Sequence, residues 1–460
     1  MRMYHYTLAA LLVMAMFGCS ADKDDEVCNC EEEDTVLPSG KTVPSGTALT
    51  PAFQFSDVAY QVTSTAGAEG IQARVDAANA FYVAIAQKLA DADPNANFAF
   101  SPFSVQAAFG LLYPATAADG AAAKEFVAAL GFDADQAAFH DAMHGHQLAV
   151  EAAFANPPAE KTLTYSLVNQ VWTDESFGLQ AEYLDTIKKY YNSGVGVLPL
   201  RASSEDSRTT INAFIAGNTN DLIKDLIPAG AITSDTSMVL TNSVYMLADW
   251  LQPFTKENSS PAAFANADGT SSTPVTMHAT DYFQYAETSD FQALSMDYVG
   301  SKVAMLVVLP KAGTQFAAFV ADFDLEDYRA AVDGLASSQV KLSLPKFSIE
   351  WGTNSIKEAL QGMGMVETFS PTTNHFPKLL TKDGAPVTTD TWIQDVFHKA
   401  KVIVDEKGTE AAAATAIVVG ETSSLPPQDE IAFTVDRPAL FFIYETTYKG
   451  IIFAGRIAKL

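Results

Sequence analysis

The stretch of sequence that decides the fold is EKGTEAAAATA, residues Glu406–Ala416. It follows the largely apolar run Ala400–Val404 and precedes the β-branched run Ile417–Val419. Glutamate and alanine are good helix formers, so an isolated segment of this composition favours a helix. The same residues also fit a strand, because a period of two leaves only small or β-branched side chains on one face. These side chains are Thr409, Ala411, Ala413, Thr415, Ile417 and Val419.

The strand interpretation suits a segment that enters a sheet between two existing strands. Small side chains fit such a position, and proline, which would interrupt a new ladder, does not occur from Lys407 to Leu425. Gly408 provides a point where the backbone can turn without the constraint of a Cβ atom. The residues alone thus leave two interpretations open, a helix and a strand that can join a sheet.

Two longer segments resemble a known family. KVIVDEKGTEAAAATA (Lys401–Ala416) is similar to the end of the fifth strand of the main sheet of serpins, together with the hinge of inhibitory members. FTVDRPALFFIYETTYKGIIFAGRI (Phe433–Ile457) resembles the C-terminal serpin signature, and the resemblance extends over roughly Ile71–Leu460. It implies an α+β fold, a serpin-like single domain with three β-sheets surrounded by helices and an exposed reactive loop at about residues 406–432.

Composition excludes several classes of function. The chain has 460 residues, of which 48% are hydrophobic, and a formal net charge of −27. This apolar content suffices for a packed core, whereas the negative charge argues against nucleic acid and other polyanions as partners. The three cysteines, Cys19, Cys28 and Cys30, all precede the folded region, so no disulfide is expected in the domain. Cys28 and Cys30 could pair with each other, but no metal site and no cofactor are expected.

The first 70 residues read as an export signal and a linker. Residues 1–19 contain the apolar run Leu8–Phe17 and end in Met16–Cys19, which resembles a bacterial lipobox. We therefore expect an extracytoplasmic protein: an outer-membrane lipoprotein carrying its lipid on Cys19, or a secreted protein if an ordinary signal peptide is cut nearby. Residues 20–70 are acidic and rich in proline, serine and glycine, and are predicted to be a flexible linker before a domain at 71–460.

Hydrophobic periodicity predicts the main elements of that domain. Ser101 is expected to cap a helix whose first residue is Pro102. Helices are predicted at Ile71–Ala90, twice within Ala117–Phe154, and at Leu179–Tyr191, Asn212–Leu226 and Ser355–Met363. Strands are predicted at Thr162–Thr173, Met238–Trp250, Phe291–Tyr298, Lys302–Pro310 and Gln339–Glu350, the last with an irregularity at Pro345.

Three histidines, His140, His144 and His146, lie close together in the alanine-rich helical region. A metal site is conceivable, but a solvated helix face is the favoured interpretation. In heparin-activated serpins a helix of this region carries lysine and arginine. Here the only basic residue of that region other than histidine is Lys124, so we expect no activation by a polyanion.

The resemblance also implies the residues of the site. Ser101, Ser104, Asn242 and His398 match a buried cluster beneath the point where the main sheet parts, with His398 expected to be the partner of the serine hydroxyls. Trp250 matches the region where the loop enters, and Lys346 is implied to pair with Glu406. Ser101 and His398 could also be drawn as a hydrolase dyad. The sequence contains no GxSxG, HExxH, P-loop or strand-linked GxGxxG motif, so no enzymatic activity is expected.

The implied function is inhibition of a serine protease, or of a cysteine protease, through a covalent acyl-enzyme complex formed by a monomer. Cut bonds in the family usually lie about sixteen residues beyond the hinge glutamate, which places this one at Thr422–Ser423. Other bonds remain open as alternatives: Val419–Gly420, Gly420–Glu421 and Ser424–Leu425. The residues implied for the hinge are Glu406, Gly408, Thr409, Glu410, Ala411, Ala412, Ala413 and Ala414.

A threonine before the cut bond suits the shallow primary pocket of elastase-like or subtilisin-like proteases. No basic residue lies between Gly408 and Asp436, which argues against trypsin-like targets. The alternative function is that of a non-inhibitory serpin acting as a carrier, a chaperone or a structural surface protein. Non-inhibitory relatives tend to have bulkier or charged hinges than this one.

Overall fold

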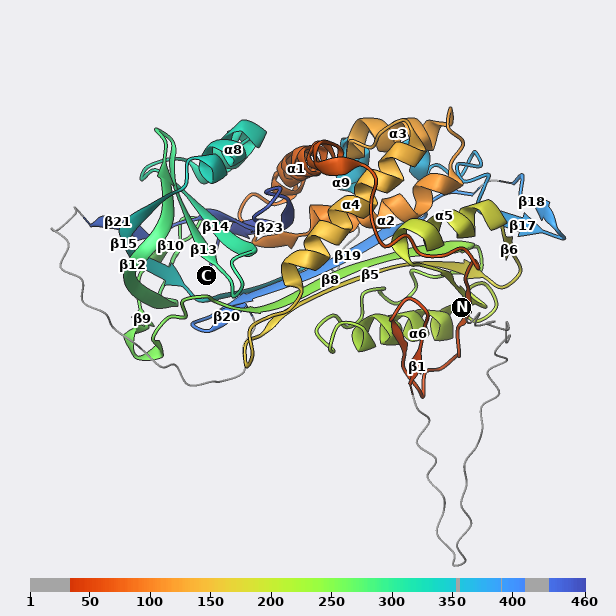
Figure 1. Ribbon diagram of the computed structural model, residues 1–460, viewed down its shortest axis with the longest axis horizontal. Coiled ribbons are helices and arrows are strands. Elements are labelled where there is room, and N and C mark those ends of the chain that lie inside the picture. Colours follow the sequence, from red (N-terminus) through yellow and green to blue (C-terminus); the bar gives the residue numbers. More distant parts are fainter. Residues whose placement is uncertain (1–33, 353–355, 390, 410–429) are drawn as a thin grey trace, which may run out of the picture. The chain divides into compact units, whose positions relative to one another are not determined.

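The main sheet contains seven strands in the order β16-β19-β20-β8-β5-β7-β3 (Figure 1). Their bounds are Phe347–Trp351 (β16), Val396–Val404 (β19), Gly408–Thr409 (β20), Met238–Asp249 (β8), Leu163–Asp174 (β5), Val195–Leu198 (β7) and Ala52–Gln54 (β3). The computed structural model describes residues 34–352, 356–389, 391–409 and 430–460. The long strands β5 and β8 pair antiparallel from Leu163–Ala248 to Thr173–Met238 and form the middle of the sheet.

A second large sheet has the strand order β21-β15-β12-β13-β14-β22-β23-β4, with β9 also pairing with β12. The strands are Phe98–Phe100 (β4), Ser260–Pro261 (β9), Val275–Glu287 (β12), Phe291–Asp297 (β13), Val303–Pro310 (β14), Ala336–Pro345 (β15), Ile431–Thr434 (β21), Ala439–Glu445 (β22) and Ile451–Ile457 (β23). Three small sheets of the described residues complete the β-structure: β1 (Thr35–Val36) with β2 (Thr42–Val43), β10 (Phe264–Ala265) with β11 (Ser271–Ser272), and β6 (Gly178–Leu179) with β17 (Leu380–Lys382) and β18 (Ala385–Pro386).

Helices cover both faces of the main sheet (Figure 1). The α-helices are Gly67–Ala92 (α1), Pro102–Leu112 (α2), Ala121–Leu130 (α3), Gln136–Phe154 (α4), Ala181–Tyr191 (α5), Ser204–Gly217 (α6), Phe316–Asp322 (α7), Leu325–Asp333 (α8) and Lys357–Gly362 (α9). Helices α1–α4 lie on one side and α6 on the other, so the sheet separates a large hydrophobic core from a smaller one that includes Trp172 and Phe214. The predicted α+β class is confirmed.

Helix α2 is the central buried element of the large core. All of its residues are buried. As predicted, Ser101 caps it, because its Oγ accepts a hydrogen bond from the backbone N–H of Ser104 at 3.2 Å, and Pro102 is its first residue. The cap places two serines at the same end of the helix, directly beneath the main sheet.

Two predicted elements differ from the structure. The helix predicted at Asn212–Leu226 begins earlier, at Ser204, and ends at Gly217. Beyond it, Asn220, Asp221 and Asp225 have positive φ values, which end helical geometry, while apolar residues of the irregular segment still pack inward and imitate a helical period. The single strand predicted at Gln339–Glu350 is two strands, β15 and β16, because the chain passes from one sheet to the other after Pro345.

The predicted linker is also wrong over much of its length. Residues 34–66, which we call the N-terminal strap, lie against the domain. Strand β3 pairs antiparallel with β7. The ring of Phe53 lies 5.6 Å from Trp172 and 5.7 Å from Phe214, and Lys41 Nζ donates to the carbonyl of Asn169 at 2.6 Å. The few apolar residues of the strap complete the smaller core. The average composition of the segment does not reveal their burial.

The histidines of α4 are not on a solvated face, contrary to expectation. His140, His144 and His146 are each at most 2% exposed. Nδ1 of His140 shares a hydrogen bond with the hydroxyl of Tyr191 at 2.7 Å, and the His146 ring lies 4.7 Å from that of Phe103. Burial lowers the pKa of His140 and of His146 to about 3, so both rings are neutral at physiological pH.

Neither a metal cluster nor a membrane-spanning helix occurs in the described ranges. No group of three or more His, Cys, Asp or Glu side chains in residues 34–352, 356–389, 391–409 and 430–460 could hold a metal ion. Over the same ranges, no helix is long and apolar enough to cross a membrane.

Candidate functional site

The candidate site is the place where strands β19 and β8 part. In the first part of β19, the two strands pair directly and parallel, from Val396–Leu240 to Ala400–Val244. At the C-terminal ends of β19 and β8, the short strand β20 lies between them and pairs antiparallel with both. Thr409 faces Val404 on one side and Ala248 on the other, and its side chain is 1% exposed. Gly408 and Thr409, which precede residues 410–429, thus form a short strand in the middle of the sheet.

An aromatic pair holds this short strand in place. Trp250, the residue that follows β8, stacks on Tyr298 with ring centroids 4.4 Å apart and an interplanar angle of 12°. The hydroxyl of Tyr298 lies 2.7 Å from Oγ1 of Thr409. Nε1 of Trp250 donates to the carbonyl of Asp405 at 2.9 Å, and its backbone N–H donates to the carbonyl of Lys407 at 2.7 Å. Trp250 therefore contacts the segment through which the chain enters the sheet.

Gly408 is required by the close approach of β20 to β8. A Cβ atom added at this position would lie 2.0 Å from the carbonyl oxygen of Ala248 and 2.7 Å from Cα of Asp249. These are backbone atoms of a central strand, which cannot move aside cheaply. The turn before β20 is closed by Asp405, whose Oδ1 accepts from the N–H groups of Lys407 and Gly408 at 2.9 and 3.2 Å.

Glu406 and Lys346 form an ion pair beside the hinge. Nζ of Lys346 donates to Oε2 of Glu406 at 2.7 Å, and the glutamate side chain is 12% exposed. Burial alone would raise the pKa of Glu406. The hydrogen bonds that the carboxylate accepts from Lys346, from its own backbone N–H and from Ser259, together with the positive charge of Lys346, outweigh that effect, so the net pKa lies below the usual value for glutamate. Glu406 is therefore ionised and fixed at neutral pH.

The four residues expected beneath the sheet come together where β19 and β8 are still paired. Nδ2 of Asn242 donates to the carbonyl of Ser104 at 2.7 Å and to its hydroxyl at 2.5 Å, and Oδ1 of Asn242 shares a hydrogen bond with Nδ1 of His398. Nε2 of His398 accepts from the backbone N–H of Ser101 at 3.3 Å. The cluster thus joins β8, β19 and the start of α2.

One expected detail of this cluster is wrong. His398 is not the partner of the serine hydroxyls, because the Ser101 hydroxyl donates to the carbonyl of Ile452 at 2.6 Å and that of Ser104 accepts from Asn242. Burial lowers the pKa of His398 to about 3, so the ring is neutral. The Ser101 hydroxyl does not bond to the His398 ring, so these two side chains are not arranged as the nucleophile and base of a hydrolase.

Sequence reasoning missed two members of the site. Asn169, on β5, donates through Nδ2 to the carbonyl of Ser104 at 3.1 Å, and its Oδ1 accepts from Asn242 at 2.5 Å. Tyr298 carries the hydroxyl that meets Thr409. The asparagine could have been found as a polar residue in the second half of β5, which is buried. No local signal identified the tyrosine, since its partner lies 111 positions away along the chain.

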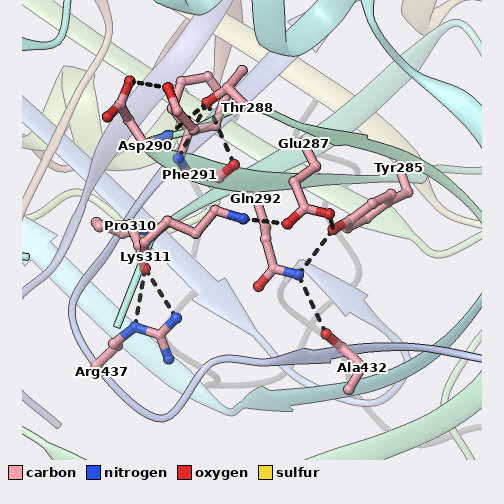
Figure 2. A network of polar contacts seen from close by, with 11 residues as sticks. Tyr285, Glu287, Thr288, Asp290, Phe291, Gln292, Pro310, Lys311, Ala432 and Arg437 are labelled. Carbon is pink, nitrogen blue, oxygen red and sulfur yellow. Dashed lines mark hydrogen bonds and ion pairs between the residues drawn. The ribbon is translucent and has the colours of Figure 1, made fainter. Parts of the chain in front are cut away.

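The chain that follows residues 410–429 pairs with the second sheet. Strand β21 pairs parallel with β15 from Val340–Ile431 to Ser343–Thr434. Figure 2 shows the polar network around it: Nε2 of Gln292 donates to the hydroxyl of Tyr285 at 2.9 Å and to the carbonyl of Ala432 at 3.4 Å. The guanidinium of Arg437 donates twice to the carbonyl of Pro310, at 3.0 and 2.9 Å. The described segments on either side of residues 410–429, β20 and β21, therefore pair with different sheets.

Several predicted residues lie outside the described part of the chain, so the structure does not test the roles expected of them. They belong to the second part of the hinge, to the expected cut bond with its alternatives, and to the N-terminal cysteines. The hinge residues are Glu410, Ala411, Ala412, Ala413 and Ala414. The expected cut bond is Thr422–Ser423, its alternatives lie within residues 419–425, and the cysteines are Cys19, Cys28 and Cys30.

In the described part of the chain, the short strand β20 lies between β19 and β8 of the main sheet, and β21 pairs with β15 of the second sheet. A family model described as Serpin (serine protease inhibitor) matches residues 76–460, and the chain belongs to the serpin family. Mouse antithrombin-III is 29% identical over 458 residues, covering 98% of this chain and 96% of that protein. Human antithrombin-III is 30% identical and covers 81% of this chain and 79% of its own length.

Solved structures support the same fold. The crystal structure of tengpin, a thermophilic serpin, in its native state superposes with a TM-score of 0.75 at 20% sequence identity. The match covers 90% of this chain and all of that one. The serpin fold predicted from the sequence is confirmed.

Proposed function

We propose that this serpin is an inhibitory one, which traps serine proteases as a suicide substrate by inserting its cut loop into the main sheet. The observation that carries the proposal is the position of Gly408 and Thr409 between β19 and β8. Below them the two strands are still paired at Val396–Ala400. These pairings support the proposal. A longer strand that continues from β20 would pass between β19 and β8, and its first residues already pair with both.

The chemistry begins as ordinary proteolysis. The protease serine attacks the carbonyl carbon of Thr422, the Thr422–Ser423 amide bond breaks, and the new amine of Ser423 leaves with a proton. Thr422 is then joined to the protease by an ester. A cysteine protease would form a thioester by the same steps. Once the loop is cut, residues 410–422 are free to extend β20 and to carry the attached protease along the sheet before water cleaves the ester.

Insertion is favourable because strand addition supplies backbone hydrogen bonds and buried apolar contacts together. The inserted strand must displace the direct β19–β8 pairing, and the cluster of Asn242 and His398 lies at this pairing. Sixteen residues of extended chain span about 50 Å, enough to cross a sheet built of strands of this length. Small residues in the hinge sequence, Ala411, Ala412, Ala413 and Ala414, fit the narrow path between two existing strands.

The sequence of the loop selects the target. A threonine before the cut bond fits proteases with shallow primary pockets, of the elastase and subtilisin type, and not trypsin-like enzymes, which require lysine or arginine. The protein would act as an extracytoplasmic monomer, tethered by a lipid on Cys19 or secreted. Its interaction with the target would be covalent and needs neither a cofactor nor an activity of its own.

The test is to mix the purified protein with elastase, subtilisin and trypsin and to follow intact mass and SDS-stable bands. We expect a covalent adduct with elastase or subtilisin, with a fragment released at Ser423. Thr409→Arg places a charged side chain at a position that is 1% exposed. It should allow cleavage but abolish the adduct. The matched control is Thr280→Arg, on an exposed position of β12, which should keep the adduct. Rapid cleavage of the unsubstituted protein without any adduct would favour the non-inhibitory alternative.

A further inference from the structure

Tyr298 links the second sheet to the hinge strand. It follows β13, forms an isolated bridge with Trp250, and is completely buried. Its backbone N–H donates to the carbonyl of Val303 at 3.0 Å, and the neighbouring Val299 N–H donates to the carbonyl of Asp249 at 3.0 Å. The backbone of Tyr298 is thus fixed to the ends of both sheets, and the stack on Trp250 fixes its ring.

The hydroxyl of this rigid ring meets one side chain of the entering strand. It lies 2.7 Å from Oγ1 of Thr409, and both groups are buried. A buried phenol without a partner costs free energy, so the hydroxyl favours the arrangement in which Thr409 faces it. Because side chains alternate across a strand, a slip by one residue would bring Gly408 or Glu410 to this position. Neither residue carries a hydroxyl, and an unpaired glutamate would be costly there.

We propose that Tyr298 is a positioning residue that sets the register in which the hinge enters the main sheet. Its hydrogen bond to Thr409 selects the register that turns Thr409 and the odd-numbered alanines inward. After cleavage, a strand that starts in this register extends without a pause, so the attached protease is carried away before the ester is hydrolysed. The effect on protease trapping rests on the proposed inhibitory function. The effect on the register of the hinge does not.

The experiment removes the hydrogen bond from each side. Tyr298→Phe deletes the phenol oxygen, Thr409→Val replaces the hydroxyl by a methyl group of similar size, and the double variant deletes both. Thr409→Ser keeps a hydroxyl and is the rescue. The matched control is Tyr444→Phe, which removes a buried hydroxyl that lies 3.0 Å from Oγ of Ser295 on the second sheet, away from the hinge.

Two readouts are taken on the full chain. Hydrogen exchange of the Gly408 and Thr409 amides should quicken about tenfold in Tyr298→Phe and in Thr409→Val, which corresponds to the loss of one hydrogen bond. The double variant should exchange no faster than either single one, while Thr409→Ser and Tyr444→Phe keep the original rate. With elastase or subtilisin, several times more molecules of Tyr298→Phe or Thr409→Val should be consumed for each protease molecule trapped. The rate of the first cleavage should be unchanged.

The outcomes separate this inference from the proposed function. If no protease is trapped by any variant, the inhibitory function fails, while quickened exchange at the hinge still supports the role of Tyr298. The inference is overturned if exchange at the hinge is unchanged in Tyr298→Phe, or if Tyr444→Phe quickens it equally through general loosening. If Tyr298→Phe does not fold, Thr409→Val tests the same bond from the other partner.

Discussion

The ammonium of Lys346 lies 2.7 Å from the carboxylate of Glu406, and the two residues belong to segments that enter the site from different directions. Lys346 occupies the single position between β15 of the second sheet and β16 of the main sheet. Glu406 stands two residues before β20. The ion pair therefore ties the start of the hinge to the point where the chain crosses between the sheets.

We expect Glu406→Gln to lower the free energy of unfolding by about 1 kcal/mol at pH 7, because a partly exposed ion pair contributes modestly. The folded-state pKa of Glu406 is depressed, so its contribution is present above the unfolded pKa of about 4.3 and is lost as pH falls through the lower folded value. Urea unfolding at several pH values checks this. A difference between the two proteins that persists unchanged at the lowest pH would contradict it.

Gly408→Ala should withdraw the hinge from the sheet. The added methyl group would overlap the backbone of Ala248 and Asp249, so β20 cannot keep its pairing with β8. We expect the amides of residues 408 and 409 to exchange at least about tenfold faster, with little change in β8. Gly362→Ala, at the end of α9, is the control, since its nearest neighbour would be the flexible side chain of Lys88 at 3.5 Å. Unchanged protection at Gly408 would show that the strand adapts.

Buried neutral histidines should make the protein sensitive to acid. The folded-state pKa of His146 is about 3, below the unfolded value of about 6.5. Its contribution to stability is therefore present above pH 6.5 and is lost as pH falls toward 3, by up to about 1.4 kcal/mol per pH unit. Between pH 6 and 4, His146 should take up close to one proton when the protein unfolds. His146→Leu removes this uptake, so the slope of unfolding free energy against pH should fall by about 1.4 kcal/mol per pH unit. An unchanged slope would show that the ring is protonated in the fold.

The hinge and the buried cluster were implied by the resemblance to serpins, and local patterns alone predicted only part of each. The small residues after Gly408 and the serine cap at Ser101 are visible in a few neighbouring positions. The hydrogen bond between Tyr298 and Thr409 was not predictable, since it depends on how two sheets meet. Likewise Lys41 and Phe53 lie in a segment whose average composition indicates a linker, although a few of its side chains are buried by the domain.

The N-terminal strap should therefore contribute to stability. Phe53→Ala removes a ring that packs on Trp172 and Phe214, and we expect it to lower the free energy of unfolding by about 2 kcal/mol, less than for a fully buried ring. Val62→Ala, at a strap position that is 74% exposed, should have no measurable effect. Urea unfolding of the two variants compares them directly. If Phe53→Ala is as stable as Val62→Ala, the strap rests on the domain without supporting it.

Cleavage of the loop should make the protein more resistant to heat, in contrast to ordinary proteolysis. The inserted strand would form about ten or more backbone hydrogen bonds at about 1 kcal/mol each, and for a domain of this size we expect the melting temperature to rise by about 20 °C. The measurement is thermal unfolding before and after a single cut near Thr422, verified by intact mass. In Thr409→Arg the same cut should raise the melting temperature far less, because the charged side chain cannot enter between β19 and β8. A cut protein that melts where the uncut one does would mean that no strand is added, and the inhibitory mechanism would fail with it.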